Sequence, residues 1–174
     1  HRLKGGMLHL GLAPADGTPM PHMAPGQFVE VAVDKAHVLL NRPFSIFNFT
    51  PTLLELLVKP LGRASEALGL YEAGDMLRVI APLGSGFTLP EAPARVLLAG
   101  GGVGIAPLYY LARALNERGI RPTMVYGERT APDASLKAML EAVADLHICT
   151  DDGSEGHHGF VIAHPAVLDG EYDL

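Results

Sequence analysis

The chain has 174 residues, a formal net charge of −6 at neutral pH and a hydrophobic content of 48%. This acidic balance, without a basic run, argues against nucleic acid and anionic membrane surfaces as partners. No apolar run approaches the roughly 20 residues that cross a bilayer, and no secretory signal is visible. The single cysteine, Cys149, excludes an internal disulfide and predicts a reducing, cytoplasmic compartment.

The first half of the chain alternates short strands with turns. Thr50-Pro51-Thr52 separates two apolar strands and predicts a hairpin, and Ser65 is expected as the N-cap of a short helix over residues 65–71. About six short strands with one small helix indicate an antiparallel β-barrel. The strands are expected over residues 7–12, 27–33, 44–49, 53–59 and 76–81.

The pattern changes after residues 90–93. Three apolar strands are separated by two helices, and this β-α-β-α-β order predicts a parallel sheet with right-handed crossovers. Two domains are therefore expected, an antiparallel barrel over residues 1–91 and an α/β domain over residues 92–174. The strands of the second domain are expected over residues 95–99, 122–126 and 145–150, and its helices over residues 107–117 and 135–143.

Both ends of the chain read as cuts. The first residue is His1, and residues 171–174 resemble the beginning of a further strand. We therefore expect the chain to be a piece of a longer protein.

A glycine-rich run lies between the first strand and the first helix of the second domain. Glycines let the backbone approach a pyrophosphate, and the N-terminus of a helix attracts its charge. The run is neither a P-loop nor the Rossmann fingerprint, because Pro107 stands where a third glycine is needed; Pro107 suits the first helical position. A phosphorylated ligand and a tight packing turn both remain open. The run reads Ala99-Gly100-Gly101-Gly102-Val103-Gly104-Ile105-Ala106-Pro107-Leu108.

A second candidate site begins at Arg42 in the first half. Beside a proline-stiffened strand start, this arginine can hold its guanidinium toward a phosphate or a ring, and Ser45 offers a hydroxyl. On these residues alone, a surface arginine beside a strand is the favoured reading. Farther along, Gly62 and Ser65 form either a phosphate cradle or an ordinary strand-to-helix turn.

Taken in order, these segments resemble the ferredoxin reductase superfamily, and most of all the electron transfer subunits of NAD-dependent (class 1B) dihydroorotate dehydrogenase. The resemblance covers nearly the whole chain, and the order and spacing of its motifs are specific. The matching blocks are Arg42-Pro43-Phe44-Ser45-Ile46, Gly74-Asp75, Pro82-Leu83-Gly84-Ser85-Gly86-Phe87, the glycine run, Tyr126-Gly127-Glu128-Arg129, Thr150-Asp151-Asp152-Gly153-Ser154-Glu155-Gly156 and His158-Gly159-Phe160-Val161.

The resemblance implies FAD in the barrel domain. Arg42 would face the pyrophosphate, and Ser45 would lie near the reactive flavin nitrogen. Ala64 and Ser65 match a Gly-Thr pair that caps the FAD phosphates, with Ala64 departing from the glycine of that pair. The residues implied in flavin binding are Arg42, Pro43, Phe44, Ser45, Leu57, Val58, Lys59, Ala64 and Ser65.

The resemblance also implies NAD(H) in the second domain. Gly127 and Arg129 match a position that reaches the adenosine end of the dinucleotide, and one arginine there leaves NAD and NADP both open. The nicotinamide would meet the flavin and transfer a hydride. The residues implied in dinucleotide binding are Gly100, Gly101, Gly102, Val103, Gly104, Pro107, Gly127 and Arg129.

The family further carries a Cys-Gly-Pro motif and a cysteine cluster that ligates a 2Fe-2S centre. Asp173-Leu174 matches the residues just before that motif, and one cysteine cannot supply the four thiolates of a cluster. The 2Fe-2S centre is thus implied for the longer protein, with no metal expected in this chain. The implied partner is a dihydroorotate dehydrogenase catalytic subunit, in a heterotetramer that serves pyrimidine (UMP) biosynthesis.

Two other functions remain open. One is a ferredoxin-NAD(P) reductase-like subunit of a hydrogenase or another redox complex. The other is a non-catalytic module that keeps the fold and has lost FAD. The visible spectrum of the full-length protein would separate them.

The remaining polar residues are expected to be structural. His157-His158 is predicted to lie in a polar loop and not to bind zinc, because no spaced His or Cys completes a tetrahedral set. Asp151 and Asp152 are expected to shape that turn. Cys149 is expected to be a buried small hydrophobe, and Tyr109-Tyr110 to pack within a helix.

Overall fold

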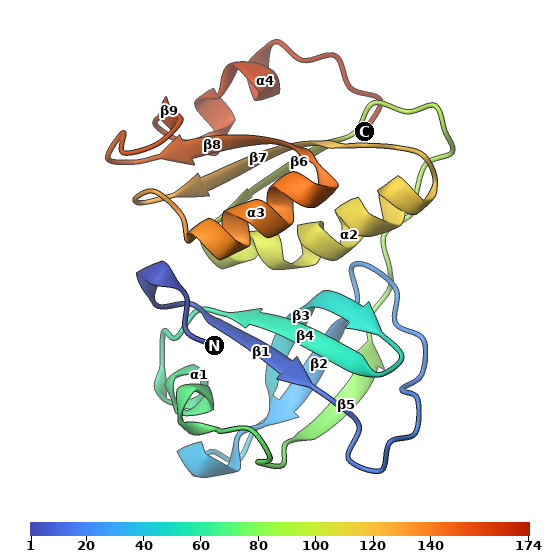
Figure 1. Ribbon diagram of the computed structural model, residues 1–174, viewed down its shortest axis with the longest axis vertical. Helices are drawn as coiled ribbons and strands as arrows, with labels where there is room; N and C mark the ends of the chain where they lie inside the picture. Colours follow the sequence, from blue (N-terminus) through green and yellow to red (C-terminus); the bar gives the residue numbers. More distant parts are fainter. The chain divides into compact units, whose positions relative to one another are not determined.

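The computed structural model describes residues 1–174. The chain divides into two compact units, His1–Phe87 and Thr88–Leu174 (Figure 1). This division lies slightly N-terminal to residue 92, where the change of pattern places the boundary. Each unit contains one sheet, antiparallel in the first and parallel in the second, so the predicted fold class is confirmed.

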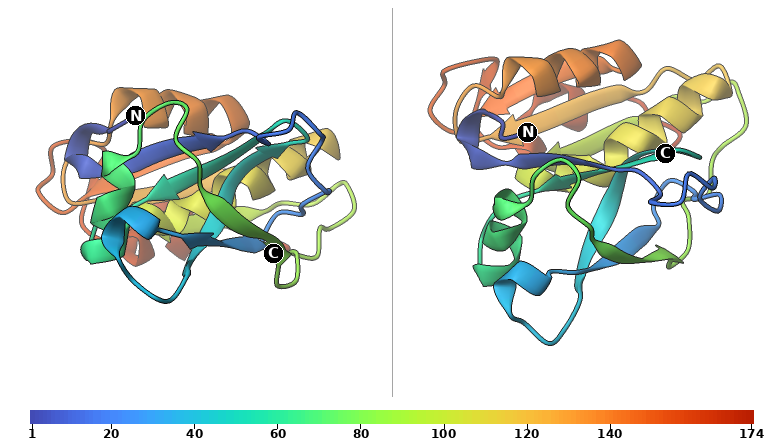
Figure 2. Two further views of the ribbon diagram at one scale, coloured as in Figure 1. Left: turned by 90° about the horizontal axis from the view of Figure 1, so that it is seen from below. Right: turned by 60° about the horizontal axis from the view of Figure 1, so that its bottom comes forward.

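The first unit is built on five strands, whereas the sequence pattern predicted about six in a small barrel. They pair in the order β1-β4-β3-β2-β5, and every neighbouring pair is antiparallel. Figure 2 shows how strongly this sheet is curved. The strands are β1 (Leu8–Leu12), β2 (Phe28–Ala32), β3 (Arg42–Thr50), β4 (Leu53–Val58) and β5 (Arg78–Leu83).

Alternation along β2 fixes the face that the first unit buries. Val29 and Val31 are fully buried, whereas Phe28 and Glu30, which alternate with them along the strand, are half-buried. Fully burying one aliphatic side chain of this size contributes about 1.5–3 kcal/mol. The predicted hairpin is present, because β3 and β4 pair across the turn at residues 51–52.

The strand predicted over residues 76–81 is displaced, since β5 begins at Arg78 and continues through Pro82 to Leu83. Proline cannot donate to a ladder, so a strand containing it is tolerated at a sheet edge. β5 is an edge strand and pairs only with β2. The sequence reading stopped before Pro82 because strand order, and with it the edge, is a property of the folded chain.

The helix expected to begin at Ser65 begins earlier. α1 (Arg63–Ala67) has Gly62 as its N-cap and is followed by the 3-10 turn η3 (Leu68–Leu70). Ser65 is therefore not the N-cap. Its Oγ instead accepts from the backbone N–H groups of Leu61 (3.1 Å) and Gly62 (3.2 Å), which lie before the helix.

The second unit is a four-stranded parallel sheet in the order β6-β7-β8-β9. Figure 1 shows α2 and α3 on one face of this sheet and α4 beyond the other face. The strands are β6 (Leu97–Gly101), β7 (Thr123–Glu128), β8 (Asp145–Thr150) and β9 (His157–His158), and the helices are α2 (Ala106–Glu117), α3 (Ala134–Val143) and α4 (Pro165–Leu168). The 3-10 turns are η1 (Lys4–Gly6), η2 (Asp34–Ala36), η3, η4 (Gly102–Ile105) and η5 (Val161–Ala163).

The expectation of a polar loop at His157-His158 is wrong. These residues form β9, in register with Cys149 and Thr150 of β8. The chain turns back tightly enough that a Cβ at Gly156 would lie 2.1 Å from the carbonyl oxygen of Ile148, and Gly156 has a φ of +68°. Glycine thus makes the close return possible, and β9, η5 and α4 were all missed by sequence periodicity.

Residues 173–174 lie beside the start of β6. Asp173 donates its backbone N–H to the carbonyl of Arg95 (2.8 Å), and Leu97 donates to the carbonyl of Leu174 (3.0 Å). Residues 171–174 therefore belong to no strand of the structure, although these two hydrogen bonds pair residues 173–174 with residues 95–97. No helix of the chain combines the length and apolar character that a bilayer span requires.

Candidate cofactor-binding sites

The predicted flavin segment forms the first part of β3. Arg42, Phe44 and Ser45 are half-buried and Pro43 is exposed. The Arg42 guanidinium is held close to its own loop, because Nη1 donates to the carbonyl oxygens of Leu40 (2.9 Å) and Asn41 (3.2 Å). The remaining guanidinium N–H groups stay available for an anion, which suits the predicted role at a pyrophosphate.

β3 and β4 cease to pair where both predicted flavin segments begin. Their register runs from Thr50–Leu53 to Ile46–Leu56 and stops there, although β3 extends back to Arg42 and β4 on to Val58. Over this stretch β3 pairs with β2 and β4 pairs with β1. On the sides away from β2 and β1, the backbone N–H and C=O groups of these two strand ends have no partner in the β3–β4 ladder. They can hydrogen-bond the polar edge of a planar ring.

Leu57 and Val58 cannot offer their side chains to a ligand. They are 2% and 1% exposed and belong to the core of the first unit. If this part of β4 contacts a flavin, it does so through its backbone, and half-buried Lys59 supplies the cation just beyond it. The sequence could not show whether residues 57–58 would contact a ligand through side chains or through backbone, because the burial of both Leu57 and Val58 depends on the curvature of the sheet.

Ser65 and Ala64 lie in the first turn of α1, as a phosphate cap would require. The Gly62 N-cap has no side chain to satisfy the first N–H groups of the helix, so they stay available to an anion. Ala64 is only 6% exposed. The Ser65 hydroxyl donates to the Gly62 carbonyl (3.0 Å) and is occupied in shaping its own turn.

The glycine run joins β6 to α2 through η4, and its glycines have different reasons for lacking a side chain. Gly102 has a φ of +54°. A Cβ at Gly100 would lie 3.1 Å from Cδ1 of Leu108, so this glycine lets α2 pack on β6. A Cβ at Gly104 would meet nothing within 4 Å, which leaves open space beside an uncapped helix start. The packing turn and the ligand loop are thus both compatible with the run, at different glycines.

Pro107 lies one position later than expected. α2 begins at Ala106, so Pro107 occupies the second helical position and not the first. Both positions lack an intrahelical acceptor for their N–H, so proline is accommodated without loss.

The pairing of β6 with β7 brings Gly127, and Arg129 shortly after it, beside the glycine run. Gly101 and Gly127 are register partners at the carboxyl ends of β6 and β7, which is where parallel sheets bind ligands. A Cβ at Gly127 would lie 2.5 Å from Cγ2 of Val161, so η5 packs directly on this position. Arg129 is exposed and its guanidinium makes no hydrogen bond or ion pair within the protein, so it is free for a ligand.

Several residues are confirmed as structural. Cys149 is fully buried, as expected of a small hydrophobe, and this burial raises the pKa of its thiol. Asp152 accepts from the backbone N–H of Ser154 (2.9 Å) and shapes the turn as expected. Tyr109 and Tyr110 lie within α2 and are 9% exposed. No group of three or more His, Cys, Asp or Glu side chains has a geometry that could hold a metal ion.

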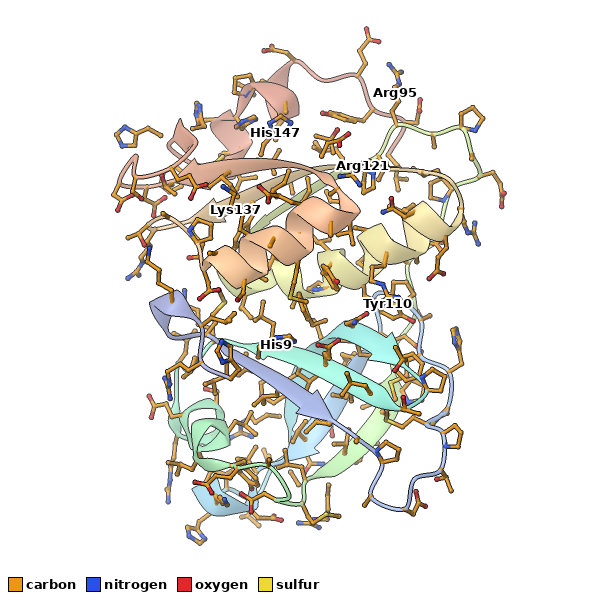
Figure 3. The ribbon with its side chains drawn as sticks, viewed as in Figure 1. His9, Arg95, Tyr110, Arg121, Lys137 and His147 are labelled. Carbon is orange, nitrogen blue, oxygen red and sulfur yellow. The ribbon has the colours of Figure 1, made fainter.

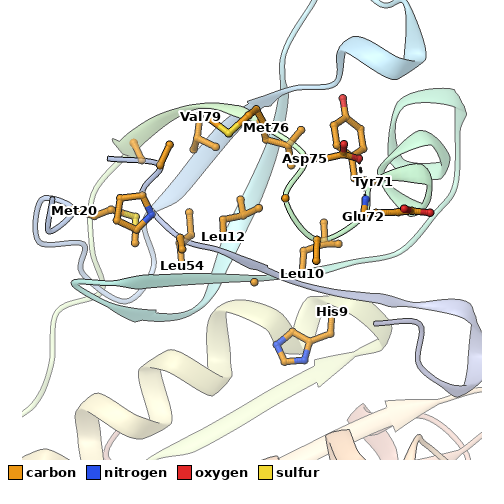
Figure 4. A pocket seen from close by; sticks show the side chains of 18 of the residues that line it. His9, Leu10, Leu12, Met20, Leu54, Tyr71, Glu72, Asp75, Met76 and Val79 are labelled. Atoms are coloured by element: carbon orange, nitrogen blue, oxygen red, sulfur yellow. Dashed lines mark hydrogen bonds between the residues drawn. The ribbon is translucent and has the colours of Figure 1, made fainter. Parts of the chain in front are cut away.

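The cavity of the first unit was not foreseen. Its volume is about 760 Å³, and it lies between the two edge strands β1 and β5. Figure 4 shows Leu12 and Val79 among the apolar side chains that line it, with Glu72 and Asp75 near one end. None of the predicted flavin residues lines this cavity. Sequence reasoning could not find it, because the cavity depends on which strands become edges.

Comparison with known proteins places this geometry in context. No family model matches the chain. The dihydroorotate dehydrogenase B (NAD(+)) electron transfer subunit of Shouchella clausii (strain KSM-K16) is 40% identical over 152 aligned residues, covering 84% of this chain and 59% of the relative. The subunit of the same name from Listeria monocytogenes serotype 4a (strain HCC23) is 35% identical over 149 residues, covering 83% and 59%. The chain thus spans less than two thirds of these relatives.

Two solved structures have a similar fold. The NADH-dependent reduced ferredoxin-NADP oxidoreductase, described in work on flavin-based electron bifurcation, has a TM-score of 0.80 and 31% identity, covering 95% of this chain and 59% of that one. Phthalate dioxygenase reductase has a TM-score of 0.78 and 21% identity, covering 99% and 55%, and supports the fold alone.

An antiparallel sheet followed by a parallel sheet, with a glycine run at the carboxyl end of β6, gives this chain a ferredoxin reductase-like fold. Over the matched residues the chain is homologous to the electron transfer subunits of dihydroorotate dehydrogenase B. The resemblance read from the motifs is therefore confirmed.

Proposed function

We propose that this chain is the FAD- and NAD(H)-binding part of an oxidoreductase, the electron transfer subunit of a dihydroorotate dehydrogenase in the cytoplasm. The observation that carries the proposal is the end of β3–β4 pairing at Ile46–Leu56, which frees both predicted flavin segments. The names of the relatives at 35–40% identity support the same role.

The first unit would hold FAD. Arg42 would bind the pyrophosphate, Ser45 would donate a hydrogen bond to the reactive flavin nitrogen, and the first turn of α1 would bind phosphate oxygens. When bound, FAD supplies chemistry that accepts two electrons and returns them one at a time. The backbone of residues 57–58 and Lys59 would fix the orientation of the ring. The flavin residues proposed are Arg42, Pro43, Phe44, Ser45, Leu57, Val58, Lys59, Ala64 and Ser65.

The second unit would hold NAD(H) along the carboxyl ends of β6 and β7. The glycine run would let the backbone approach the pyrophosphate, and the unpaired guanidinium of Arg129 would face the adenosine end. The exposed guanidinium of Arg129 can meet a 2′-hydroxyl or a 2′-phosphate. We assign NAD because the relatives are named as NAD(+) enzymes.

A 2Fe-2S centre does not fit the residues of this chain. Cluster ligation requires four thiolates, and the only cysteine, Cys149, is fully buried. We place the cluster in the part of the longer protein that this chain does not contain, and the catalytic subunit of dihydroorotate dehydrogenase as its partner in pyrimidine biosynthesis.

The test is a visible spectrum of the full-length protein, purified under anaerobic conditions and supplied with excess FAD. We expect flavin absorbance that NADH bleaches, together with iron–sulfur absorbance. Protein that retains no flavin, or retains flavin that NADH leaves oxidised, would overturn the proposal.

A second function is favoured by one comparison. The NADH-dependent reduced ferredoxin-NADP oxidoreductase matches 95% of this chain at 31% identity, so a reductase subunit of another redox complex fits the same geometry. Co-purification distinguishes the two, because a dihydroorotate dehydrogenase subunit brings down a partner that oxidises dihydroorotate. A flavoprotein that captures a different oxidoreductase would establish the second function instead.

A further inference from the structure

Three histidines from three different elements meet in the second unit. They are His147 of β8, His157 of β9 and His164, the N-cap of α4. The ring centroid of His164 lies 5.0 Å from that of His147 and 5.3 Å from that of His157. Figure 3 shows His147 on the side of the sheet toward α4. We call these three residues the histidine trio.

His164 also caps the helix that follows it. Its Nδ1 accepts a hydrogen bond from the backbone N–H of Ala166, at 3.0 Å. A neutral imidazole can accept at one ring nitrogen, whereas both nitrogens of the protonated ring are donors. The cap at α4 is therefore lost if Nδ1 takes up a proton.

The segment from β9 to α4 is held to the sheet by few apolar contacts. β9 pairs over two residues, and neither η5 nor α4 contains a buried residue. Phe160, Ile162 and Leu168 are 70%, 75% and 66% exposed. Elements with so little buried apolar surface open at low free-energy cost, so the imidazole contacts and the cap are a large share of what holds this segment.

No carboxylate pairs with the trio. The acidic groups on neighbouring elements are engaged elsewhere: Asp145 pairs with Arg121, Glu155 with Lys137, Glu128 accepts from Tyr126, and Asp152 accepts from Ser154. Of the other groups nearby, His158 contacts the backbone carbonyl of Asp151, and Asp169 follows α4. Protonation of the trio therefore places like charges side by side without compensation.

The pKa of His164 shifts in the direction that this geometry predicts. Burial and the neighbouring imidazoles of His147 and His157 lower the pKa of His164 below its ordinary value of 6.5. A lowered pKa in the folded segment means that the released segment binds protons more readily. Closure is thus most stable above pH 6.5 and weakens as the pH falls through the lowered value.

We propose that the histidine trio is a proton-operated latch: neutral imidazoles hold the segment from His157 to Leu168 on the sheet, and their protonation releases it. Because Val161 of this segment packs on Gly127, release also loosens the carboxyl end of β7. Acidification therefore weakens dinucleotide binding at that end of the sheet, a regulation that rests on the proposed function.

The latch is tested by amide hydrogen exchange of the full chain at pH 7.5 and 5.5, with a chelator present and rates corrected for the intrinsic effect of pH. We expect protection over residues 157–168 to fall severalfold, because the released segment binds protons more readily than the closed one. Protection in β6 and β7 before Gly127 should change far less. Equal protection of residues 157–168 at both pH values would overturn the latch.

His164→Asn is the decisive variant, because asparagine caps helices well and does not titrate in this range. We expect its protection over residues 157–168 to be the same at pH 7.5 and 5.5, even where the loss of the imidazole contacts lowers it at both. His22→Asn changes an exposed histidine of the first unit and should keep the wild-type response. A His164→Asn protein that opens at pH 5.5 as the wild type does would overturn the proposal.

The imidazole proton resonances of the wild type give a reading that needs no variant. We expect the His164 resonance to titrate below its ordinary value of 6.5. A His164 resonance that titrates at or above 6.5 would count against the latch.

The link to the dinucleotide is measured separately, as the Kd for NAD⁺ at the two pH values. We expect severalfold weaker binding at pH 5.5 in the wild type and no change in His164→Asn. Opening without a change in Kd would overturn the regulation alone, whereas absence of NAD⁺ binding at either pH would count against the proposed function and leave the exchange test intact.

Discussion

Two glycines of one loop have opposite physical reasons for being glycine. At Gly100 a Cβ would press on Leu108 at 3.1 Å and on the Gly104 carbonyl oxygen at 3.3 Å, whereas at Gly104 it would meet nothing within 4 Å. The first glycine therefore serves packing. The open space beside the second is where we propose that the dinucleotide approaches the backbone.

We predict that Gly100→Ala and Gly104→Ala will have different effects. Gly100→Ala should lower the free energy of unfolding by about 1–3 kcal/mol through overpacking. Gly104→Ala should leave stability within about 0.5 kcal/mol and weaken NAD⁺ binding at least tenfold, because its methyl group occupies the ligand's space. Urea denaturation and titration with NAD⁺ measure the two quantities. Unimpaired NAD⁺ binding by Gly104→Ala would favour a packing turn.

The hydroxyl of Ser45 is proposed to donate a hydrogen bond to the reactive flavin nitrogen. We predict that Ser45→Ala slows flavin reduction by NADH about fivefold, the loss of one neutral hydrogen bond of about 1 kcal/mol, while FAD affinity changes less. Rapid mixing with NADH under anaerobic conditions gives the rate. Thr50→Ala removes a hydroxyl from the far end of β3 and should keep the wild-type rate. If Ser45→Ala also reduces at the wild-type rate, the proposed role of the hydroxyl is wrong.

At the scale of elements, helix ends decide how the parallel unit is assembled. Asp133 is the N-cap of α3 and accepts from the backbone N–H groups of Ser135 (2.8 Å) and Leu136 (3.4 Å). Leu136 and Leu140 then fall on the buried face. The cap thus fixes where α3 starts and which side chains it buries.

We predict that Asp133→Ala lowers the free energy of unfolding by about 1 kcal/mol, as is typical when a helix loses its N-cap. Asp133→Asn keeps a capping oxygen and should lose much less. Denaturant midpoints of the two variants provide the comparison. Equal losses in both would mean that the charge of Asp133, and not its cap, is what stabilises the helix.

At the scale of the whole molecule, acid should weaken both units. The Lys35 ammonium lowers the pKa of Asp75 in the first unit, and the Ser154 hydroxyl lowers that of Asp152 in the second. A carboxyl with a lowered folded pKa contributes stability that is complete above its ordinary value of 3.8 and is lost as the pH falls through the lowered one.

We therefore predict a lower urea midpoint at pH 3 than at pH 5. Asp75→Asn should reduce this difference, since it removes one of the titrating groups and leaves a side chain of similar shape. A midpoint that does not change between pH 5 and pH 3 would contradict the assignment of these carboxyls.

The sequence determined the features that depend on local pattern. Alternation at Val29 and Val31 gave a half-buried strand, Thr50-Pro51-Thr52 gave the hairpin, and the order of strands and helices after residue 93 gave the parallel sheet. Ordered motifs also predicted the resemblance to the electron transfer subunits. These inferences hold because turn chemistry and hydrophobic period act between residues that are close along the chain.

Only the tertiary structure decided which groups come together across the chain. The end of β3–β4 pairing at Ile46–Leu56, the cavity between the edge strands and the contact of Val161 with Gly127 all depend on strand order and register. The histidine trio joins residues of three elements, two of which have no periodic signal. Such contacts are set by sheet curvature and by loop closure over long separations, and local sequence patterns carry neither.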